Sequence, residues 1–288
     1  MFTMKNSHLK HLLQLNIAMM FISTSGVLGR FIQMPPPLTI WWRSLFAIVC
    51  LGVFVWYKKI NIVVASKDKF TILLSGLLMG AHWVTYFYAL KVSNVAIAML
   101  SIFTYPIITV FLEPIFFRIK LELKNVLLGL LVLLGIYFLS PTFNLESNQT
   151  QGVLFGVASA LFYALRNIIM KKKIDNYHGS MLMFYQMIVI ALVLSPVLFY
   201  YETSPTTNDW FGLAALALFT TTVGHTLFVV SMKHFSIGAA SIMSSIQPVF
   251  GIVFGIIFLS EIPSKNTLIG GFLIILTVVL KSINNTKK

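Results

Sequence analysis

Cysteine, acidic residues and charge in general are scarce in this sequence. A single cysteine, Cys50, occurs among 288 residues, which excludes an internal disulfide bond and a metal cluster held by cysteines. Asp and Glu number 8 against 21 Lys and Arg, and only 10% of the residues are charged. So little charge does not fit a water-soluble domain of ordinary composition.

The motifs of common enzyme classes are also missing. The chain has no HExxH, no P-loop, no G-x-S-x-G and no pair of aspartates within an apolar run. We therefore expect that the protein is not an enzyme and has no cofactor or metal site. The lack of a P-loop also means that there is no built-in ATP motor.

Long apolar runs dominate what is present. Hydrophobic residues make up 58% of the chain, and the mean hydropathy is +0.88. Runs of about 20 apolar residues separated by short polar joints are typical of helices that cross a bilayer. The sequence therefore predicts an all-α polytopic membrane protein in contact with the lipid bilayer. The ten expected transmembrane helices are 12–32, 38–57, 70–90, 94–117, 124–140, 151–170, 180–201, 210–232, 237–259 and 266–283.

Positive charge gathers in the joints on one side of these helices. The net charge is +13, but because Lys and Arg stand in short joints between apolar runs, we expect no nucleic-acid partner. The side of the N-terminus carries sixteen Lys and Arg, while the opposite side has Lys91 and Lys265. The positive-inside rule then places both termini in the cytoplasm, in the inner (plasma) membrane of a bacterium. The first run lacks a small-residue cleavage site, so we expect no removed signal peptide.

Part of the first half of the chain recurs in the second half. Residues 94–135 align without a gap with residues 236–277, so that Pro106 meets Pro248. Apolar residues coincide easily by chance, and the comparison therefore depends on the aligned prolines and glycines. Two copies of one structural unit are the prediction.

The copies divide the chain into residues 1–142 and residues 143–288, with five expected helices each. Because five is an odd number, the second copy enters the membrane upside down. Inverted repeats of this kind are a transporter architecture, with the substrate site near mid-membrane between the halves.

Four stretches carry a resemblance to a known family. They are WWRSLFA, YALKVSNVAIAMLSIFTYPIITVFLEPIFF, GVLFGVASALFYALRNIIMKK and VVSMKHFSIGAASIMSSIQPVFGIVFGIIFLSE. In order and spacing they resemble the EamA-type family of the drug/metabolite transporter superfamily, over essentially the whole chain. The resemblance implies ten helices around a central cavity and alternating access for small organic solutes, and many relatives export amino acids or other metabolites. Such repeats usually have a glutamate thirteen residues after the proline; Glu261 meets this pattern, but the first half has Ile119.

The run LTIWWRSLFAIVCLGVFVWY contains an arginine. Arg43 lies about 7.5 Å along the helix from Leu38 at 1.5 Å per residue. An ionisable residue inside a membrane is a functional candidate by default. A planar guanidinium binds a carboxylate through two hydrogen bonds, which suits an amino or organic acid. Three partners stay open for Arg43: the solute, a gate residue such as Glu261, and lipid phosphate.

Six further residues are assigned to substrate binding with Arg43. They are polar or aromatic residues within the expected helices, namely His82, Trp83, Tyr86, Tyr163, Asn167 and Gln247. At helical spacing His82 and Tyr86 share one face, with Trp83 beside them. The alternative for each is an interhelical hydrogen bond or an aromatic ring that faces lipid.

Five residues are assigned to gating or ion coupling: Arg30, Glu113, Arg166, His225 and Glu261. Arg30 lies at the end of its run and could instead snorkel to the interface. Glu113 and Arg166 both lie toward the cytoplasmic side, where they would form an inner gate or a permanent ion pair. Glu113 is also the one mid-span acid available for proton coupling.

Two prolines are the expected hinges. Gln247 directly precedes Pro248, just as Tyr105 precedes Pro106 in the first half. Proline frees a backbone carbonyl one turn earlier and bends the helix, so both positions suit a site that changes shape.

Together these patterns predict a secondary transporter that works by alternating access. An amino acid or a related carboxylate-bearing metabolite is the expected solute, moved outward, because three arginines face one glutamate within the runs. Two alternatives stay open: a broad exporter of aromatic or cationic drugs, and a non-transporting membrane scaffold or sensor. The solute, the coupling ion and the oligomeric state, monomer included, are not determined by the sequence.

Overall fold

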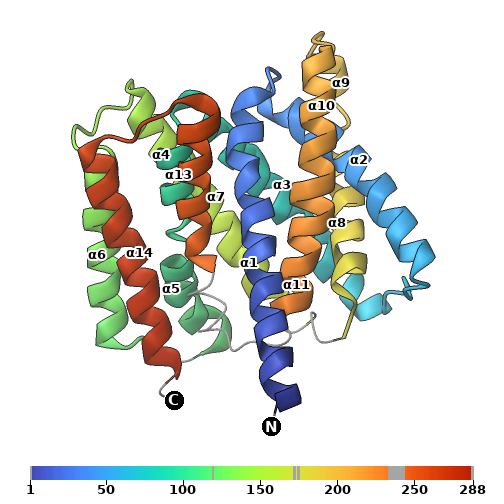
Figure 1. Ribbon diagram of the computed structural model, residues 1–288, viewed down its shortest axis with the longest axis horizontal. Coiled ribbons are helices and arrows are strands. Elements are labelled where there is room, and N and C mark those ends of the chain that lie inside the picture. Colours follow the sequence, from blue (N-terminus) through green and yellow to red (C-terminus); the bar gives the residue numbers. More distant parts are fainter. Residues whose placement is uncertain (1, 119, 171–172, 174–175, 233–243, 287–288) are drawn as a thin grey trace.

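The computed structural model describes residues 2–118, 120–170, 173, 176–232 and 244–286, and within these ranges every regular element is a helix. The helices lie side by side in one bundle (Figure 1). In chain order they are α1 (Phe2–Phe31), α2 (Pro36–Tyr57), η1 (Ser66–Asp68), α3 (Lys69–Val92), α4 (Val95–Ile102), α5 (Tyr105–Phe117), α6 (Leu123–Leu139), α7 (Asn148–Met170), α8 (Gly179–Leu194), α9 (Val197–Tyr200), α10 (Thr207–Ala215), η2 (Leu216–His225), α11 (Thr226–Met232), α13 (Ile246–Leu259) and α14 (Lys265–Thr286). The predicted all-α fold is therefore confirmed.

Several of these helices have the length and composition of membrane spans. Six segments of the described chain qualify: Pro36–Tyr57, Ser66–Val92, Val95–Phe117, Asn148–Met170, Gly179–Tyr200 and Thr207–Phe228. Three more apolar helices are shorter, at Leu123–Leu139, Ile246–Leu259 and Lys265–Leu280. These findings support a membrane protein with several crossings, while the number ten stays a prediction.

Successive long helices run in opposite directions between two ends of the bundle (Figure 1). Helices α1, α3 and α13 end at the upper end of this view, whereas α2, α5 and α7 end at the lower end. Helix α1 begins and α14 finishes at the lower end. Upper end and lower end are used in this sense below.

Proline interrupts the predicted helix 94–117. The chain forms α4 and α5, separated by a turn at Phe103 and Thr104, and Pro106 occupies the first turn of α5. Because Pro106 has no N–H, it cannot donate the hydrogen bond that would continue α4. In the second half, α13 carries Pro248 in its first turn in the same way, while residues 237–243 of that predicted helix lie outside the described residues.

The predicted helices 180–201 and 210–232 are also not single regular helices. Pro196 separates α8 from α9 for the reason just given. The second consists of α10, the ten-residue π-helix η2 and α11. Within η2 the Thr221 hydroxyl donates to the carbonyl oxygen of Leu216, five residues back, at 3.2 Å. Hydroxyls that bond to the backbone compete with regular helical bonds, and π segments are frequent at functional sites.

Glycines let neighbouring helices approach closely. A Cβ added to Gly76 of α3 would come within 2.7 Å of Val189 in α8. One added to Gly270 of α14 would come within 2.6 Å of the carbonyl oxygen of Gly135 in α6. Small residues are favoured at such seams because lipid supplies no hydrophobic force that drives helices together.

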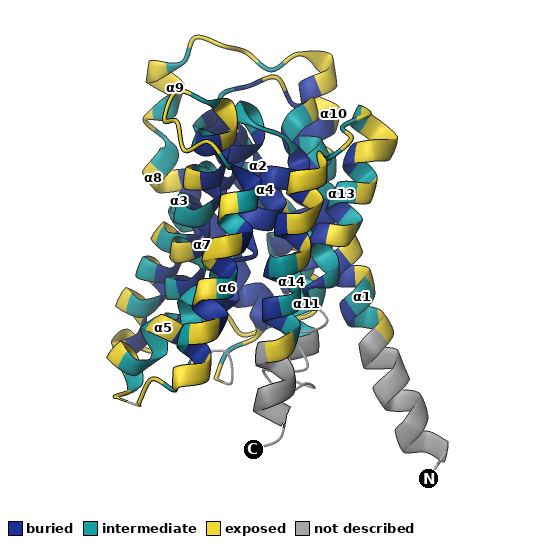
Figure 2. Cartoon of the chain, turned by 90° about the vertical axis from the view of Figure 1, so that its left-hand side faces the viewer, coloured by how far each residue is buried: buried dark blue, intermediate teal, exposed yellow. Residues whose placement is uncertain are grey.

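Burial separates the inside of the bundle from its periphery (Figure 2). Outward-facing side chains are largely apolar, for example Val53 of α2, Leu130 of α6 and Phe258 of α13, which are 60%, 58% and 68% exposed. Contiguous exposed apolar surface is rare on soluble monomers and marks contact with lipid or protein. In contrast, several polar residues are fully buried near the middle of the bundle, and they form the candidate site.

Candidate functional site

Side chains in the middle of the bundle enclose a cavity of about 40 Å³. Its lining comes from α1, α2, α3, the α4–α5 break, α7, the η2–α11 junction and the start of α13: Met19, Ile22, Ser25, Arg43, His82, Trp83, Tyr86, Ile102, Phe103, Tyr105, Tyr163, His225, Phe228, Ser244 and Gln247. No aspartate or glutamate belongs to this lining, as far as the described residues go. Arg43 is therefore the one permanently charged side chain at the cavity in the described part of the chain.

Arg43 is buried, with 1% of its surface exposed. Its Nε donates a hydrogen bond to the Thr221 hydroxyl at 2.8 Å. The two terminal nitrogens, Nη1 and Nη2, are also buried and have no hydrogen-bond partner among the described residues. A buried cation without partners is costly, because the interior replaces none of the hydration that it loses. Arg43 thus offers two free donors at a cavity that contains no carboxylate of the described protein.

Trp83 fixes the orientation of this guanidinium. The Arg43 Cζ lies 3.6 Å from the centroid of the Trp83 ring, and Phe87 is the next aromatic ring at 5.9 Å. Cation–π contact of this kind stabilises a desolvated arginine and covers one face of its plane. The edge with Nη1 and Nη2 stays available for hydrogen bonds in that plane, the geometry that a carboxylate matches.

Two histidines contribute to the cavity wall. His82 is 5% exposed and stacks on Tyr163, with ring centroids 4.6 Å apart. Its Nδ1 lies 3.1 Å from the carbonyl oxygen and 2.9 Å from the hydroxyl oxygen of Ser159 in α7. His225, at the end of η2, lies 5.7 Å from Trp83 between ring centroids. His225 therefore lines the cavity, although the sequence suggested gating or coupling for it.

Much of the lining follows the alignment of the two halves. At the offset that matches Pro106 with Pro248, four pairs of aligned positions all belong to the cavity: Trp83 and His225, Tyr86 and Phe228, Ile102 and Ser244, and Tyr105 and Gln247. The Tyr105 and Ser244 hydroxyls lie 3.4 Å apart, so the two halves meet directly there. The expected hinges Pro106 and Pro248 each follow one of these lining residues, Tyr105 and Gln247.

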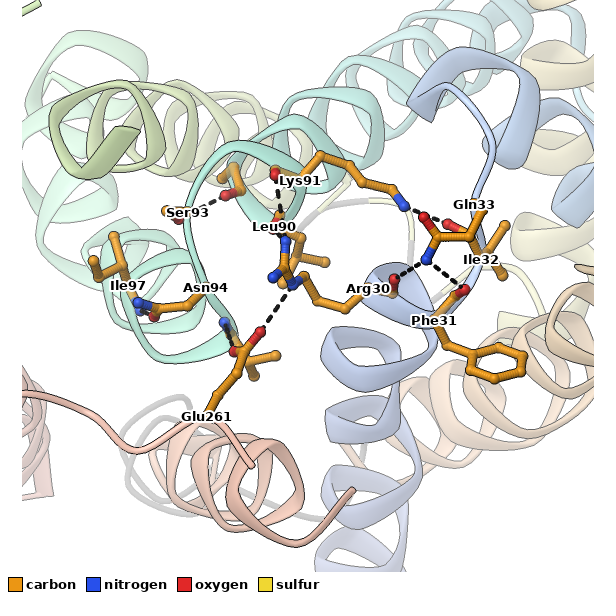
Figure 3. A network of polar contacts seen from close by, with 12 residues as sticks. Arg30, Phe31, Ile32, Gln33, Leu90, Lys91, Ser93, Asn94, Ile97 and Glu261 are labelled. Atoms are coloured by element: carbon orange, nitrogen blue, oxygen red, sulfur yellow. Dashed lines mark hydrogen bonds and ion pairs between the residues drawn. The ribbon is translucent and has the colours of Figure 1, made fainter. Parts of the chain in front are cut away.

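An ion pair closes the upper end of the bundle (Figure 3). Arg30, at the end of α1, donates from Nε to Glu261 Oε1 at 2.9 Å. Arg30 Nη1 also donates to the carbonyl oxygens of Leu90 and Lys91 at 3.1 and 3.3 Å, while Glu261 Oε2 accepts from the Val95 N–H at 2.8 Å. The cation thus sits at the C-terminus of α3 and the anion at the N-terminus of α4, as the helix dipoles favour. Among the partners considered for Arg43, Glu261 is excluded here because it bonds to Arg30.

Arg166 does not contact the partner expected for it. Its Nη2 donates to the Gln186 amide oxygen at 3.1 Å and its Nη1 to Asn167 at 3.0 Å. The described ion pairs contain no contact between Arg166 and Glu113. The physical reason is that Arg166 is directed from α7 toward α8, whereas Glu113 lies on α5. Asn167, which was expected to bind substrate, does not belong to the cavity lining. It accepts the hydrogen bond from Arg166 instead.

At the lower end of the bundle, the buried Asp68 links the segment before α3 to the segment between α7 and α8. Asp68 accepts from Lys173 Nζ at 2.5 Å and from the Tyr177 hydroxyl at 2.7 Å, and Tyr177 in turn accepts from the Ala65 N–H at 3.2 Å. The hydrogen bond to the Asp68 carboxylate raises the pKa of Tyr177 above its ordinary value. This cluster links the start of α3 to the connection between α7 and α8, and the sequence analysis did not single it out.

The cavity brings together most of the predicted binding residues and adds others. Of the residues predicted to bind substrate, six line it: Arg43, His82, Trp83, Tyr86, Tyr163 and Gln247. Ser25 and Ser244 are polar lining residues that sequence reasoning missed. The signal for Ser244 was its alignment with Ile102 beside a proline break; Ser25 carried no signal, because a serine in an apolar helix is usually satisfied by its own backbone.

Comparisons with known proteins agree with this architecture. A family model described as the EamA-like transporter family matches residues 9–140 and again residues 150–283. An uncharacterized transporter of Archaeoglobus fulgidus is 27% identical over 240 residues, covering 83% of this chain and 84% of that protein. The pseudopaline exporter CntI of Pseudomonas aeruginosa is 24% identical over 255 residues, with 88% of each chain covered. An S-adenosylmethionine uptake transporter of Rickettsia felis is 26% identical over 236 residues, covering 81% and 78%.

A solved crystal structure shows the same fold. It superposes with a TM-score of 0.69 at 17% identity, covering 96% of this chain and 98% of the other. The two family matches together span most of the sequence, and they include the arginine, the two proline breaks and every lining residue of the cavity. With apolar helices that suit a bilayer and named relatives that carry solutes rather than catalyse reactions, this chain belongs to the EamA-like transporter family of the drug/metabolite transporter superfamily, and it is a multi-pass membrane transporter.

Proposed function

We propose that the protein is a secondary transporter for an amino acid or a related carboxylate-bearing metabolite, which it moves by alternating access through the central cavity. Its ten transmembrane helices form two inverted repeats, residues 1–142 and 143–288. The aligned pairs of lining residues and the two family matches support this arrangement. The proposed site lies between the two halves, where inverted-repeat transporters bind their substrates.

The state of Arg43 carries the proposal for the solute. Nη1 and Nη2 are buried, unpartnered among the described residues and held in one plane by Trp83. A carboxylate would supply two charge-assisted hydrogen bonds and the missing negative charge together. A cationic drug would instead face a buried positive charge, with no carboxylate in the described lining to offset it. The aromatic rings that line the cavity suit the apolar part of a solute.

The size of the cavity supports alternating access. At about 40 Å³ it is far below the roughly 300–1,000 Å³ of typical small-molecule pockets. A solute can therefore enter only when helices separate. We assign the gate at the upper end to Arg30 and Glu261, and the bending points to Pro106 and Pro248. The remaining candidates for coupling are Arg166 and Glu113 on the inner side and His225 at the cavity.

The orientation follows the distribution of charge. Lys and Arg gather in the connections at the lower end, which supports a cytoplasmic location of both termini and a position of the Arg30 ion pair on the outer side of the inner membrane. Relatives named as an exporter and as uptake transporters are similarly distant. Export is our proposal, from the family resemblance and the pseudopaline exporter, and the flux experiment below includes both directions.

The test is solute flux in proteoliposomes loaded with a panel of amino acids, organic acids and organic cations. We expect carboxylate-bearing solutes to move and cations to stay. Replacing Arg43 by Ala should lower flux about 100-fold or more, since up to two charged hydrogen bonds of about 1.5–3 kcal/mol each are lost. Arg43→Lys should restore part of it, because an ammonium keeps the charge without the planar pair of donors.

Arg118, an exposed arginine at the end of α5, gives the matched control. Arg118→Ala also removes one positive charge, and it should leave flux unchanged. If cations move and the Arg43 variants transport them normally, the proposed solute class is wrong. Loading the solute on one side only, with the vesicle orientation measured by protease access to the termini, decides between export and uptake.

A further inference from the structure

The hydrogen bonds around His82 determine which ring nitrogen carries a proton. The Ser159 hydroxyl oxygen lies 2.7 Å from the backbone carbonyl oxygen of His82. A carbonyl only accepts, so the hydroxyl hydrogen of Ser159 points to it. The same hydroxyl therefore cannot donate to His82 Nδ1, although its oxygen lies 2.9 Å from that nitrogen.

The second neighbour of Nδ1 leads to the same result. It is the carbonyl oxygen of Ser159, 3.1 Å away, which also can only accept. Both contacts thus require Nδ1 to be the donor, and the proton of a neutral ring is on Nδ1. The other nitrogen, Nε2, is then a bare acceptor. A proton there would place a second cation beside Arg43, in a cavity whose described lining has no acid.

The His82 ring and the Arg43 guanidinium line the same cavity. His82 belongs to the lining, and Nε2 has no hydrogen-bond partner within the described protein. Trp83 is the next residue in α3, and the Arg43 Cζ lies 3.6 Å from the centroid of its ring. Stacking on Tyr163 holds the His82 ring in place, so Nε2 cannot turn away to find another donor.

We infer that His82 accepts a hydrogen bond from the solute, and that the transporter thereby selects acids with an N–H or O–H donor near the carboxylate. This inference rests on the proposed function, because Arg43 has to hold the carboxylate. 2-Amino acids and 2-hydroxy acids present such a donor. 2-Oxo acids present only another acceptor, whose lone pairs would repel the lone pair of Nε2, and deaminated acids leave Nε2 without a partner. Ser159 acts through His82 and is a positioning residue.

The experiment compares matched ligands that differ only at the second carbon. We choose alanine, leucine and phenylalanine, each with its 2-hydroxy, 2-oxo and deaminated counterpart, and measure stabilisation of the purified protein and competition for flux in proteoliposomes. In the natural protein, the amino and hydroxy acids of at least one series should bind about 10- to 100-fold more tightly than the oxo and deaminated acids, because the latter leave the buried Nε2 acceptor unpaired.

His82→Phe keeps an aromatic ring for stacking on Tyr163 but removes the acceptor. The preference for donor-bearing acids should then fall to about 1 or below, while the affinity for the deaminated acid rises, because its binding no longer leaves a buried acceptor unpaired. Ser159→Ala keeps the imidazole and also the backbone carbonyl that accepts from Nδ1, so the preference for donor-bearing acids should largely persist. The matched control is Ser44→Ala in α2, whose hydroxyl donates to the Ile40 carbonyl one turn back, and the preference should not change.

A spectroscopic measurement keeps the inference falsifiable if the His82→Phe protein does not fold. In 15N-histidine NMR spectra, His82 should show the Nδ1–H tautomer in the natural protein and also in Ser159→Ala, where the backbone carbonyl still accepts from Nδ1. An Nε2–H tautomer or a cationic ring in the natural protein would overturn the inference. So would equal affinity for all four members of each series when binding still depends on Arg43. If no series binds and the Arg43 variants behave like the natural protein, the proposed solute class fails as well.

Discussion

Two arginines in this protein have opposite surroundings. Arg30, at the upper end, donates to a carboxylate and to two carbonyl oxygens, and its partner Glu261 also bonds to the backbone of α4. Arg43, in the middle, makes one hydrogen bond to Thr221, and its two terminal nitrogens have no partner in the described protein. Arg30 retains solvent contact, with 32% of its side chain exposed, whereas Arg43 is buried.

The difference separates a satisfied arginine from an unsatisfied one, and the unsatisfied Arg43 is the residue that we propose binds the solute. A satisfied ion pair at helix ends stabilises a conformation. An unsatisfied buried cation destabilises the empty protein and gains most when an anion arrives. Sites kept for function commonly reduce stability in this way. The predictions below are ordered from the largest expected effect to the smallest.

Arg43→Met should have the largest effect, and it should act in opposite directions on function and stability. The substitution removes the unpaired charge and fills the space with an apolar side chain, so we expect the empty protein to gain about 1–4 kcal/mol. Carboxylate flux should be lost. Thermal unfolding in detergent at a fixed scan rate, together with proteoliposome flux, measures both. An empty protein that becomes less stable would show that Arg43 is already satisfied and would erase the contrast with Arg30.

Glu261→Gln should weaken the upper end while leaving the cavity intact. The substitution removes the negative charge from the contact with Arg30 and from the α4 N-terminus. We expect a loss of about 1 kcal/mol, because both side chains are partly exposed and salt screens them.

The gating role of this pair has its own readout. In a Cys50→Ala background, a cysteine introduced at Ser25 should react faster with a membrane-impermeant thiol reagent when Glu261→Gln is present. Arg30→Gln should have the same effect, and the double variant should add little to either single change. Unchanged reactivity in both single variants would leave the pair a structural contact without a gating role.

Asp68→Asn should change the lower-end cluster and leave transport selectivity alone. The Asp68 carboxylate accepts from the Tyr177 hydroxyl and so favours its protonated form, which raises the pKa of Tyr177. Without the negative charge this pKa should fall toward its ordinary value of 10.0, and Tyr177 should ionise at lower pH. Ultraviolet titration of tyrosinate measures the change, with Tyr177→Phe to assign the signal. A titration curve equal to that of the natural protein would contradict the hydrogen bond.

Lys124→Met should have the smallest effect. Lys124 and Glu122 form an ion pair at 2.9 Å, but their side chains are 44% and 38% exposed. Exposed pairs of this kind contribute about 0–1 kcal/mol, so the unfolding temperature should barely move. A shift as large as that of Glu261→Gln would show that the Arg30–Glu261 ion pair stabilises the protein no more than an exposed ion pair does.

Much of the helical fold could be predicted from the sequence. Apolar runs of sufficient length located the helices, and prolines 106 and 248 marked where two of them break or begin. The ten-residue π-helix was not predicted, because an apolar run predicts a regular helix and does not reveal a local bond such as that from the Thr221 hydroxyl to the Leu216 carbonyl. The alignment of the halves matched Gln247–Pro248 with Tyr105–Pro106, and both Tyr105 and Gln247 line the cavity.

Partners were harder to predict than positions. The sequence analysis left Arg30 between snorkelling and gating, and proposed Glu113 for Arg166. Arg30 instead bonds to Glu261, at the far end of the chain, and Arg166 bonds to Gln186 of α8. Which side chains meet depends on the rotation of each helix about its axis and on the angle at which helices cross. Neither quantity is contained in a run of apolar residues.

Composition and sequence pattern by themselves predicted a helical membrane protein with an arginine, Arg43, inside the apolar run that forms α2. In a bilayer, every backbone polar group of a helix must be hydrogen-bonded within its own segment. A helix can therefore be predicted from its apolar run alone, without knowledge of the rest of the chain. Packing decided the rest. It placed Trp83 under the Arg43 guanidinium, turned Thr221 toward one nitrogen and left the other two at the cavity. These contacts join residues far apart in the chain, so their selection depended on the whole bundle.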